Sequence, residues 1–265
     1  MKTLLTISYD GTAYAGWQTQ PNAPTVQQTL EAALSKLYRR RVLVLGASRT
    51  DAGVHALGQR AAFRMGEGDP DIPHDKLPYA VNTLLPGDIR ILSAEAAPDS
   101  FDPIKSAKQK TYEYRIYNRA FMSPLWRLYA AHVRAPMDIT AMRKACGHLV
   151  GRHDFVAFRA AGGSAATTVR EIYGLSLEKR GELIVICVTG NGFLYNMVRI
   201  IAGTLVYVGM GKLKSDDIPA ILASKDRVRA GKTMAAHGLL LKEVVYGDGV
   251  LCKDLEAFSV SSTSF

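Results

Sequence analysis

The 265-residue sequence is poor in cysteine, with only three, at positions 146, 187 and 252. An odd number of widely spaced cysteines argues against a disulfide framework and favours free thiols in a reducing compartment. Histidine is scattered as well. His148 and His153, five positions apart, fit neither one helical face nor a metal-ligand motif, so no metal is expected. These absences predict a cytoplasmic protein.

Long uninterrupted apolar runs are also missing. The first residues, MKTLLTISYDG, carry too short an apolar run for a secretory signal. The longest apolar tract, FLYNMVRIIAGTLVYVGMG over 193–211, is interrupted by Asn196 and Arg199. We therefore predict a buried helix there rather than a membrane span, and no membrane partner.

Signatures for nucleotide binding and hydrolysis are incomplete. GMGKL over 209–213 ends in Leu where a phosphate loop needs Ser or Thr, and AGKT over 230–233 has Asp226 in place of the first Gly. GNGF over 190–193 lacks the third Gly of a dinucleotide fingerprint, and no Gly-x-Ser-x-Gly elbow is present. No nucleotide or other cofactor is therefore expected.

Basic charge is unevenly distributed along the chain. Lys and Arg number 33 against 24 Asp and Glu, a net charge of +9. Residues 1–100 hold ten basic and ten acidic side chains, so residues 101–265 carry the whole excess. A surplus confined to one region suggests a surface that faces a polyanion, with a merely solvated basic surface as the alternative.

The periodicity predicts an α+β fold. Thr25 and Gln28 have the spacing of a capping box, and Asp138 is placed to cap a second helix. Strands are predicted over 2–9, 41–46, 58–65, 88–96, 109–117 and 239–247, with a hairpin turning near 179–182; helices are predicted over 25–40, 74–85, 138–151 and 215–224 and from about 193. Each half mixes strands and helices in split βαβ style, so we predict two related halves that share a sheet.

These halves are expected at 1–105 and 106–247, the second being the basic one, with a hinge near 102–108. A tail at 248–265 lacks periodicity and is expected to be poorly ordered.

The stretch LGASRTDAGVHALGQRAAF, over 45–63, places Asp51 in a loop between two apolar runs. An ordinary turn explains an Asp followed by a Gly, because both residues favour chain reversal. A loop between strands is also a place where a side chain can meet a ligand. The local sequence leaves both interpretations open.

Six segments in order carry a resemblance to a known family: YDGTAYAGWQTQPNAPTVQQTLEAAL, ASRTDAGVHALGQ, KQKTYEYRI, HDFVAFRAAG, GNGFLYNMVRIIAGTLVYVG and HGLLLKEVVY. The chain resembles the tRNA pseudouridine synthase A family. The resemblance implies a cofactor-independent homodimeric enzyme that isomerises uridine to pseudouridine at positions 38, 39 and 40 of tRNA. It also implies two ferredoxin-like halves in one mixed, mainly antiparallel sheet, with helices on one face and a basic cleft between the halves.

The resemblance further implies roles for single residues. Asp51 matches the catalytic aspartate, Tyr112 the tyrosine that packs on the target uracil, and Arg199 the arginine that pairs with the catalytic carboxylate. Arg49 matches an arginine that helps to hold the flipped nucleotide. Since a buried acid tends to stay protonated, we expect Arg199 to lower the pKa of Asp51.

Further basic side chains are candidates for binding the phosphate backbone. Lys110, Arg159 and Arg170 belong to this group, together with Lys105, Lys108, Arg115, Arg119, Arg143, Lys144 and Arg152. The sequence departs from the family pattern at FDPI over 101–104 and at TMAA over 233–236, which leaves the modified RNA positions open.

Two other functions fit parts of the sequence. A non-catalytic RNA-binding module would use the basic surface and Tyr112 but would not need Asp51 beside Arg199. A nucleoside hydrolase would need a second acidic group for the leaving base, and Asp10 is the candidate for it.

Overall fold

The computed structural model describes residues 1–163 and 165–247, so Cys252 and the predicted tail lie outside the described residues. The described strands are β1 (Lys2–Tyr9), β2 (Leu45–Gly46), β3 (His55–Arg64), β4 (Ile89–Ala97), β5 (Ala107–Tyr117), β6 (Ala131–His132), β7 (Gly151–Asp154), β8 (Val169–Arg180), β9 (Leu183–Gly190) and β10 (Leu239–Tyr246). The α-helices are α1 (Val26–Tyr38), α2 (Leu77–Asn82), α3 (Ile139–Gly147), α4 (Met197–Gly209) and α5 (Ile218–Ser224).

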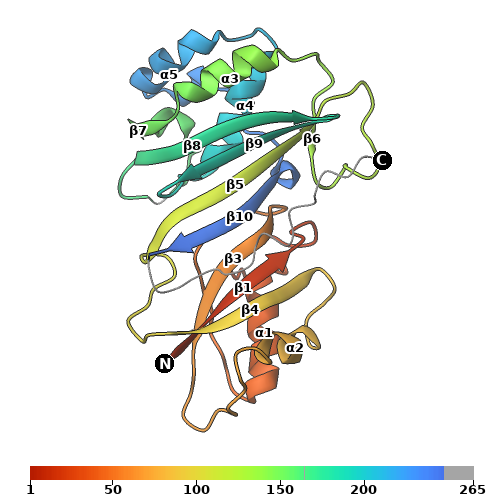
Figure 1. Cartoon of the computed structure of the whole chain (residues 1–265), viewed down its shortest axis with the longest axis vertical. Helices are drawn as coiled ribbons and strands as arrows, with labels where there is room; N and C mark the ends of the chain where they lie inside the picture. The colour runs from red at the N-terminus through yellow and green to blue at the C-terminus, as the bar shows by residue number, and fades with distance from the viewer. Residues whose placement is uncertain (164, 248–265) are drawn as a thin grey trace.

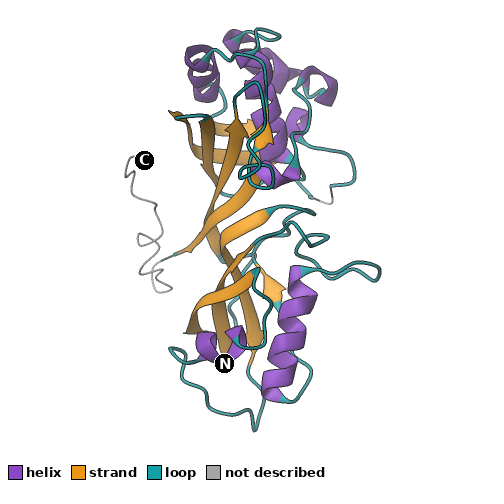
Figure 2. Cartoon of the chain, turned by 90° about the vertical axis from the view of Figure 1, so that its right-hand side faces the viewer, coloured by secondary structure: helices purple, strands orange, loops and turns teal. Residues whose placement is uncertain are grey.

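The described strands form one ten-stranded sheet in the order β4-β1-β3-β10-β5-β9-β8-β7, with β2 on β3 and β6 on β5 (Figure 1). Neighbours are antiparallel except for the pairs β3–β10 and β5–β6. Figure 2 shows α1 and most of the other helices on the same side of this sheet. The predicted α+β class and mainly antiparallel sheet are confirmed.

The last strand in the sequence lies in the middle of the sheet. β10 pairs in parallel with β3 through only two registered positions, Leu240 with His55 and Leu241 with Ala56. On its other edge β10 forms a long antiparallel ladder with β5. β10 therefore connects two parts of the sheet (Figure 1). On one side lie β4, β1 and β3, which pack with α1 and α2, and on the other side lie β5 and the strands beyond it.

Local sequence explains where the first helix begins. The Thr25 hydroxyl accepts a hydrogen bond from the Gln28 amide at 3.3 Å, which confirms the predicted cap. The residues of α1 at helical spacing, Val26, Leu30 and Leu34, are fully buried. Asp138 caps α3 in the same way, by accepting from the Ala141 amide at 2.9 Å.

The strand predicted over 41–46 is wrong except for its last two residues. Val42 and Val44 are buried, but their amides donate to Ser35 Oγ and Glu31 Oε1 of α1, both at 2.9 Å. Side chains of α1 thus satisfy the amides that a strand would have paired, so the segment follows the helix instead of the sheet.

The helix predicted from about residue 193 begins at Met197, because Asn196 has a left-handed backbone with φ of 59°. Most of α4 is buried, as predicted for the longest apolar tract. No helix in the described ranges is both long and apolar enough to cross a membrane.

The AGKT segment packs against α4. The Gly231 amide donates to Thr204 Oγ1 at 2.9 Å, and a Cβ on Gly203 would lie 1.8 Å from the Lys232 carbonyl oxygen. The glycines at 203 and 231 therefore permit close backbone contact, which explains this Gly-Lys-Thr sequence without a phosphate.

We predict that Gly203→Ala lowers the free energy of unfolding by about 1–3 kcal/mol, because the added methyl group cannot fit beside the Lys232 carbonyl. Gly147→Ala at the end of α3 is the control, since a Cβ there meets nothing within 4 Å. That control should be neutral or slightly stabilising. Urea unfolding of both variants measures the difference, and equal stabilities would contradict the packing described.

Candidate active site

Asp51 lies in the loop between β2 and β3. The loop turns back on itself, because the Val54 amide donates to the Asp51 carbonyl at 3.1 Å and Gly53 has a φ of +75°. The Trp17 amide donates to the Thr50 carbonyl at 3.0 Å, which fixes the loop against the segment that precedes α1. The stretch is thus a turn, and it also presents a partly buried carboxylate.

Arg199 reaches this carboxylate from the first turn of α4, 148 positions away in the sequence. Its Nη1 donates to Asp51 Oδ2 at 3.2 Å and to Asn196 Oδ1 at 2.6 Å. Its Nε donates to the Met234 carbonyl at 2.7 Å. Three acceptors hold one guanidinium, so its position beside Asp51 is fixed before any ligand arrives.

Two of those acceptors were missed in the sequence. Asn196 tolerates the left-handed conformation that starts α4, and an Asn just before an apolar helix is the signal that could have identified it. Met234 contributes only its backbone carbonyl, which no residue type reveals. Because this contact is made by the backbone, the departure at 233–236 does not remove it.

A cavity of about 1330 Å³ contains Asp51 and Arg199. Tyr112, Arg49, Lys110 and Arg170 also line it, together with neutral residues from 15–27 and 191–198. Among the described residues that line it, Asp51 is the only acid and four are cationic. The cavity therefore suits an anionic ligand that meets one carboxylate.

Two opposing effects set the pKa of Asp51. Burial raises the pKa of Asp51 above its ordinary value, and the Arg199 guanidinium lowers it again only in part. Arg199 thus lowers the pKa of Asp51 as expected, but the loss of solvent around the carboxyl group outweighs this single guanidinium at 3.2 Å.

Tyr112 stands on β5 with its ring nearly buried and in edge-to-face contact with Phe193, the ring centroids 5.2 Å apart. Burial raises the pKa of Tyr112 to about 12, and the negative charge of Asp51 contributes. The phenol is therefore neutral near pH 7. Its ring, not a phenolate, is what it offers to a ligand.

Only some of the predicted basic residues line the cavity, and Lys105, Lys108, Arg143 and Arg152 are not among its lining residues. Arg49, Lys110 and Arg170 line the cavity, whereas Arg159 is not among its lining residues. Arg115, Arg119 and Lys144 instead form ion pairs with Glu113, Glu182 and Asp216.

Asp10 does not lie in the cavity. Its carboxylate accepts hydrogen bonds from the Thr12 amide at 2.9 Å and from the Tyr129 hydroxyl at 2.7 Å. Although burial acts to raise it, these bonds lower the pKa of Asp10, which keeps the group ionised. Asp10 therefore cannot donate a proton to a leaving base in this cavity.

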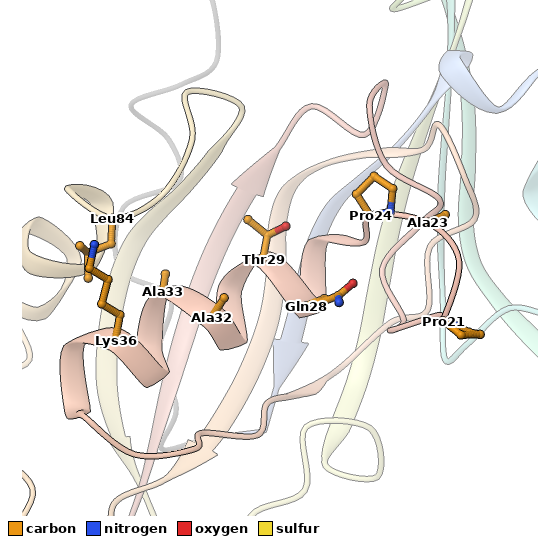
Figure 3. Close-up of a pocket in the computed structure, with 9 residues that line it drawn as sticks. All are labelled: Pro21, Ala23, Pro24, Gln28, Thr29, Ala32, Ala33, Lys36 and Leu84. Carbon is orange, nitrogen blue, oxygen red and sulfur yellow. The ribbon is translucent and has the colours of Figure 1, made fainter.

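A second hollow of about 660 Å³ lies along α1 (Figure 3). Ala32, Ala33 and Lys36 of the helix line it together with Pro21, Pro24 and Leu84. Lys36 is the one charged side chain among the described residues of this lining. None of the predicted site residues lines it, whereas Asp51, Arg199 and Tyr112 all line the larger cavity.

Comparison with known sequences identifies the family. A sequence profile described as tRNA pseudouridine synthase matches residues 5–104 and 145–247. The chain belongs to the tRNA pseudouridine synthase family. Relatives named tRNA pseudouridine synthase A include one from Ruminiclostridium cellulolyticum, 53% identical over 92% of this chain and 99% of its own. Another, from Geotalea uraniireducens, is 50% identical over 91% and 98% of the two chains.

Membership of this family confirms the resemblance drawn from the six segments. The profile covers both the Asp51 loop and α4, so both partners of the ion pair lie in family-matched sequence. Tyr112 lies between the two matched ranges.

We predict that Asp51 titrates above the ordinary aspartate value and that Arg199→Gln moves its midpoint still higher, because the variant loses the group that favours the ionised form. Carboxyl-carbon NMR of Asp51 as a function of pH measures both midpoints. Asp69, whose pKa is lowered mainly by Arg40, is the internal control and should not move. An unchanged or lower Asp51 midpoint in the variant would contradict this assignment.

Proposed function

We propose that this chain isomerises uridine to pseudouridine in tRNA, with Asp51 as the catalytic group. The observation that carries the proposal is a single carboxylate, fixed by Arg199, in a cationic cavity of a tRNA pseudouridine synthase family member. The relatives' printed name, tRNA pseudouridine synthase A, supports the substrate and the reaction.

The reaction needs little besides a positioned carboxylate. The bond from uracil N1 to the ribose C1′ breaks, the base turns, and a bond from C5 to C1′ forms. C5 loses a proton and N1 gains one, so no outside group enters and no cofactor is consumed. An ionised Asp51 either attacks C1′ or removes the 2′ proton, and both routes require the charged form.

Arg199 supplies the positive charge that an ionised carboxylate needs in a partly buried position. It keeps Asp51 oriented as well as ionised, since its other two bonds prevent the guanidinium from turning away. Because burial still raises the pKa of Asp51, turnover should fall on acidification at a higher pH than an ordinary aspartate would give.

The target base must leave its stack before its ribose can meet Asp51, at a cost of a few kcal/mol. We assign the Tyr112 ring to stacking on the flipped uracil, supported by its place in the cavity and by a pKa of about 12. That pKa disfavours Tyr112 as the acceptor of the C5 proton. Arg49 is exposed and lines the same cavity, and its planar guanidinium is able to stack in the vacated space of the RNA and to donate hydrogen bonds to the backbone at the same time.

We extend the proposal to the architecture, with one ferredoxin-like half at 1–105, a second at 106–247 and a basic cleft between them. The strand order supports this division, since β4, β1 and β3 from residues 1–105 are neighbours in the sheet, and every strand beyond β3 on that path comes from residues 106–247. The first matched range also ends at residue 104. Target positions 38, 39 and 40 and a homodimer stay predictions from the resemblance. Light scattering and mapping of modified uridines in the anticodon stem-loop test them.

Asp51→Asn should reduce pseudouridine formation by about 10⁴-fold or more while tRNA affinity changes little, because the amide keeps the shape but neither attacks nor accepts a proton. Because uridine and pseudouridine have the same mass, the product is measured by chromatographic separation of the nucleosides digested from tRNA that was incubated with the protein, and released uracil is measured alongside. Asp75→Asn, an exposed carboxylate outside the cavity, is the control. Full turnover by Asp51→Asn, or free uracil from the wild type, would overturn the proposal.

Tyr112→Phe should retain turnover within about tenfold, because a stacking ring remains, whereas Tyr112→Ala should lose about 1–3 kcal/mol of substrate binding. Single-turnover rates over a range of tRNA concentrations separate the two effects. If Tyr112→Phe were as inactive as Asp51→Asn, the hydroxyl would have a chemical role and the assignment to stacking would fail.

A further inference from the structure

Three cationic side chains in the cavity have no anionic partner within the part of the chain that the structure describes. Arg49, Lys110 and Arg170 all line it, and none of them forms an ion pair with a carboxylate of the described residues. By contrast, the fourth cation of the lining, Arg199, is paired with Asp51. The cavity therefore has a neutralised catalytic pair and a separate unneutralised group, which we call the cation triad.

The triad is assembled from three distant segments. Arg49 comes from the loop after β2, Lys110 from β5 and Arg170 from β8. Two members are held by backbone carbonyls: Lys110 Nζ donates to Ala47 at 2.6 Å, and Arg170 Nη1 donates to Val169 at 2.6 Å and to Thr167 at 2.9 Å. These bonds orient the side chains but do not cancel their charge.

The three charges affect one another. Burial, followed by the positive charges of Arg170 and Arg49, lowers the pKa of Lys110 to about 8. The positions paired with Lys110 in the neighbouring strands, Gly190 and Val244, carry no charge that would relieve this repulsion. Gathering like charges in a half-buried cavity is unfavourable unless an anion binds among them.

We propose that Arg49, Lys110 and Arg170 form a binding site for one phosphodiester of the RNA strand, next to the uridine that enters the cavity. The inference rests on the proposed function and deepens it by assigning a subsite within the same cavity. A phosphodiester fits because it carries one full negative charge and accepts several hydrogen bonds from guanidinium and ammonium donors.

The placement of Lys110 gives this phosphate a positioning role. Lys110 and Tyr112 are two residues apart on β5, so their side chains leave the same face of the sheet. A phosphate held at Lys110 therefore anchors the strand beside the stacking ring, with Asp51 and Arg199 in the same cavity. The cation triad therefore binds the RNA backbone and helps to position the base. It takes no part in breaking or forming bonds.

The test is a coupling measurement between single phosphates and single side chains. Anticodon stem-loop RNAs with one methylphosphonate each, moved along the strand, are bound to Asp51→Asn protein so that binding is measured without turnover. One methylphosphonate should weaken binding about tenfold or more. In the double variant Asp51→Asn/Lys110→Met, the same methylphosphonate should weaken RNA binding less than about threefold. Lys242→Met, an exposed lysine on β10 outside the cavity, is the matched control and should behave as the parent.

Two further readouts follow from the charge of Lys110. Lys110→Met should reduce the slope of log affinity against log salt by about one, as expected for one lost phosphate contact. Parent affinity should fall as the pH rises through about 8, whereas Lys110→Arg should not lose affinity there, because a guanidinium stays charged.

The proposal is overturned if every methylphosphonate weakens Lys110→Met as strongly as it weakens the parent. If Lys110→Met fails to fold, Arg170→Gln takes its place in the same coupling measurement with the methylphosphonate RNAs. Pseudouridine formation by the wild type is measured separately on the unmodified RNA. Absence of product there would refute the proposed function, whereas absence of coupling would refute only the phosphate site.

Discussion

The contact between Arg199 and Asp51 is the interaction on which the site depends. It joins a loop after β2 to the start of α4, and a third segment fixes it through the Met234 carbonyl. Burial disfavours the charged form of a lone carboxyl group and of a lone guanidinium, so each of the two groups stabilises the charge of the other. Since burial still outweighs the guanidinium, the pKa of Asp51 stays above its ordinary value even with Arg199 beside it.

The four cationic side chains that line the cavity fall into two groups with different partners. One cation is committed to Asp51, and the other three face the cavity without a carboxylate. In our proposal, an RNA backbone binds to the second group and does not compete for the first. The neutral Tyr112 ring lies in the same cavity and adds an uncharged surface for a base. Affinity and reactivity can therefore be altered by different substitutions.

Features of the fold and of the candidate site could be predicted from the sequence where they depend on neighbouring residues or on a motif of the family. The α1 cap at Thr25, the β8–β9 hairpin and the loop position of Asp51 were confirmed because each depends on neighbours in the chain. The strand predicted over 41–46 failed because amides there are bound by side chains of α1, a tertiary effect. The Met234 carbonyl could not be foreseen, since every residue has one. The sign of the Asp51 pKa shift depended on burial, which the sequence does not reveal.

The central position of β10 has a consequence for how the molecule is made. The ribosome releases β10 after every other described strand, yet this strand connects β3 to β5. The Arg199 anchor at Met234 is also translated late. A nascent chain without these residues has the strands for pairing β1 with β3 and β4, but it lacks β10 and the carbonyl that holds Arg199. Assembly of the proposed site therefore has to wait for a strand that is translated after every other described strand.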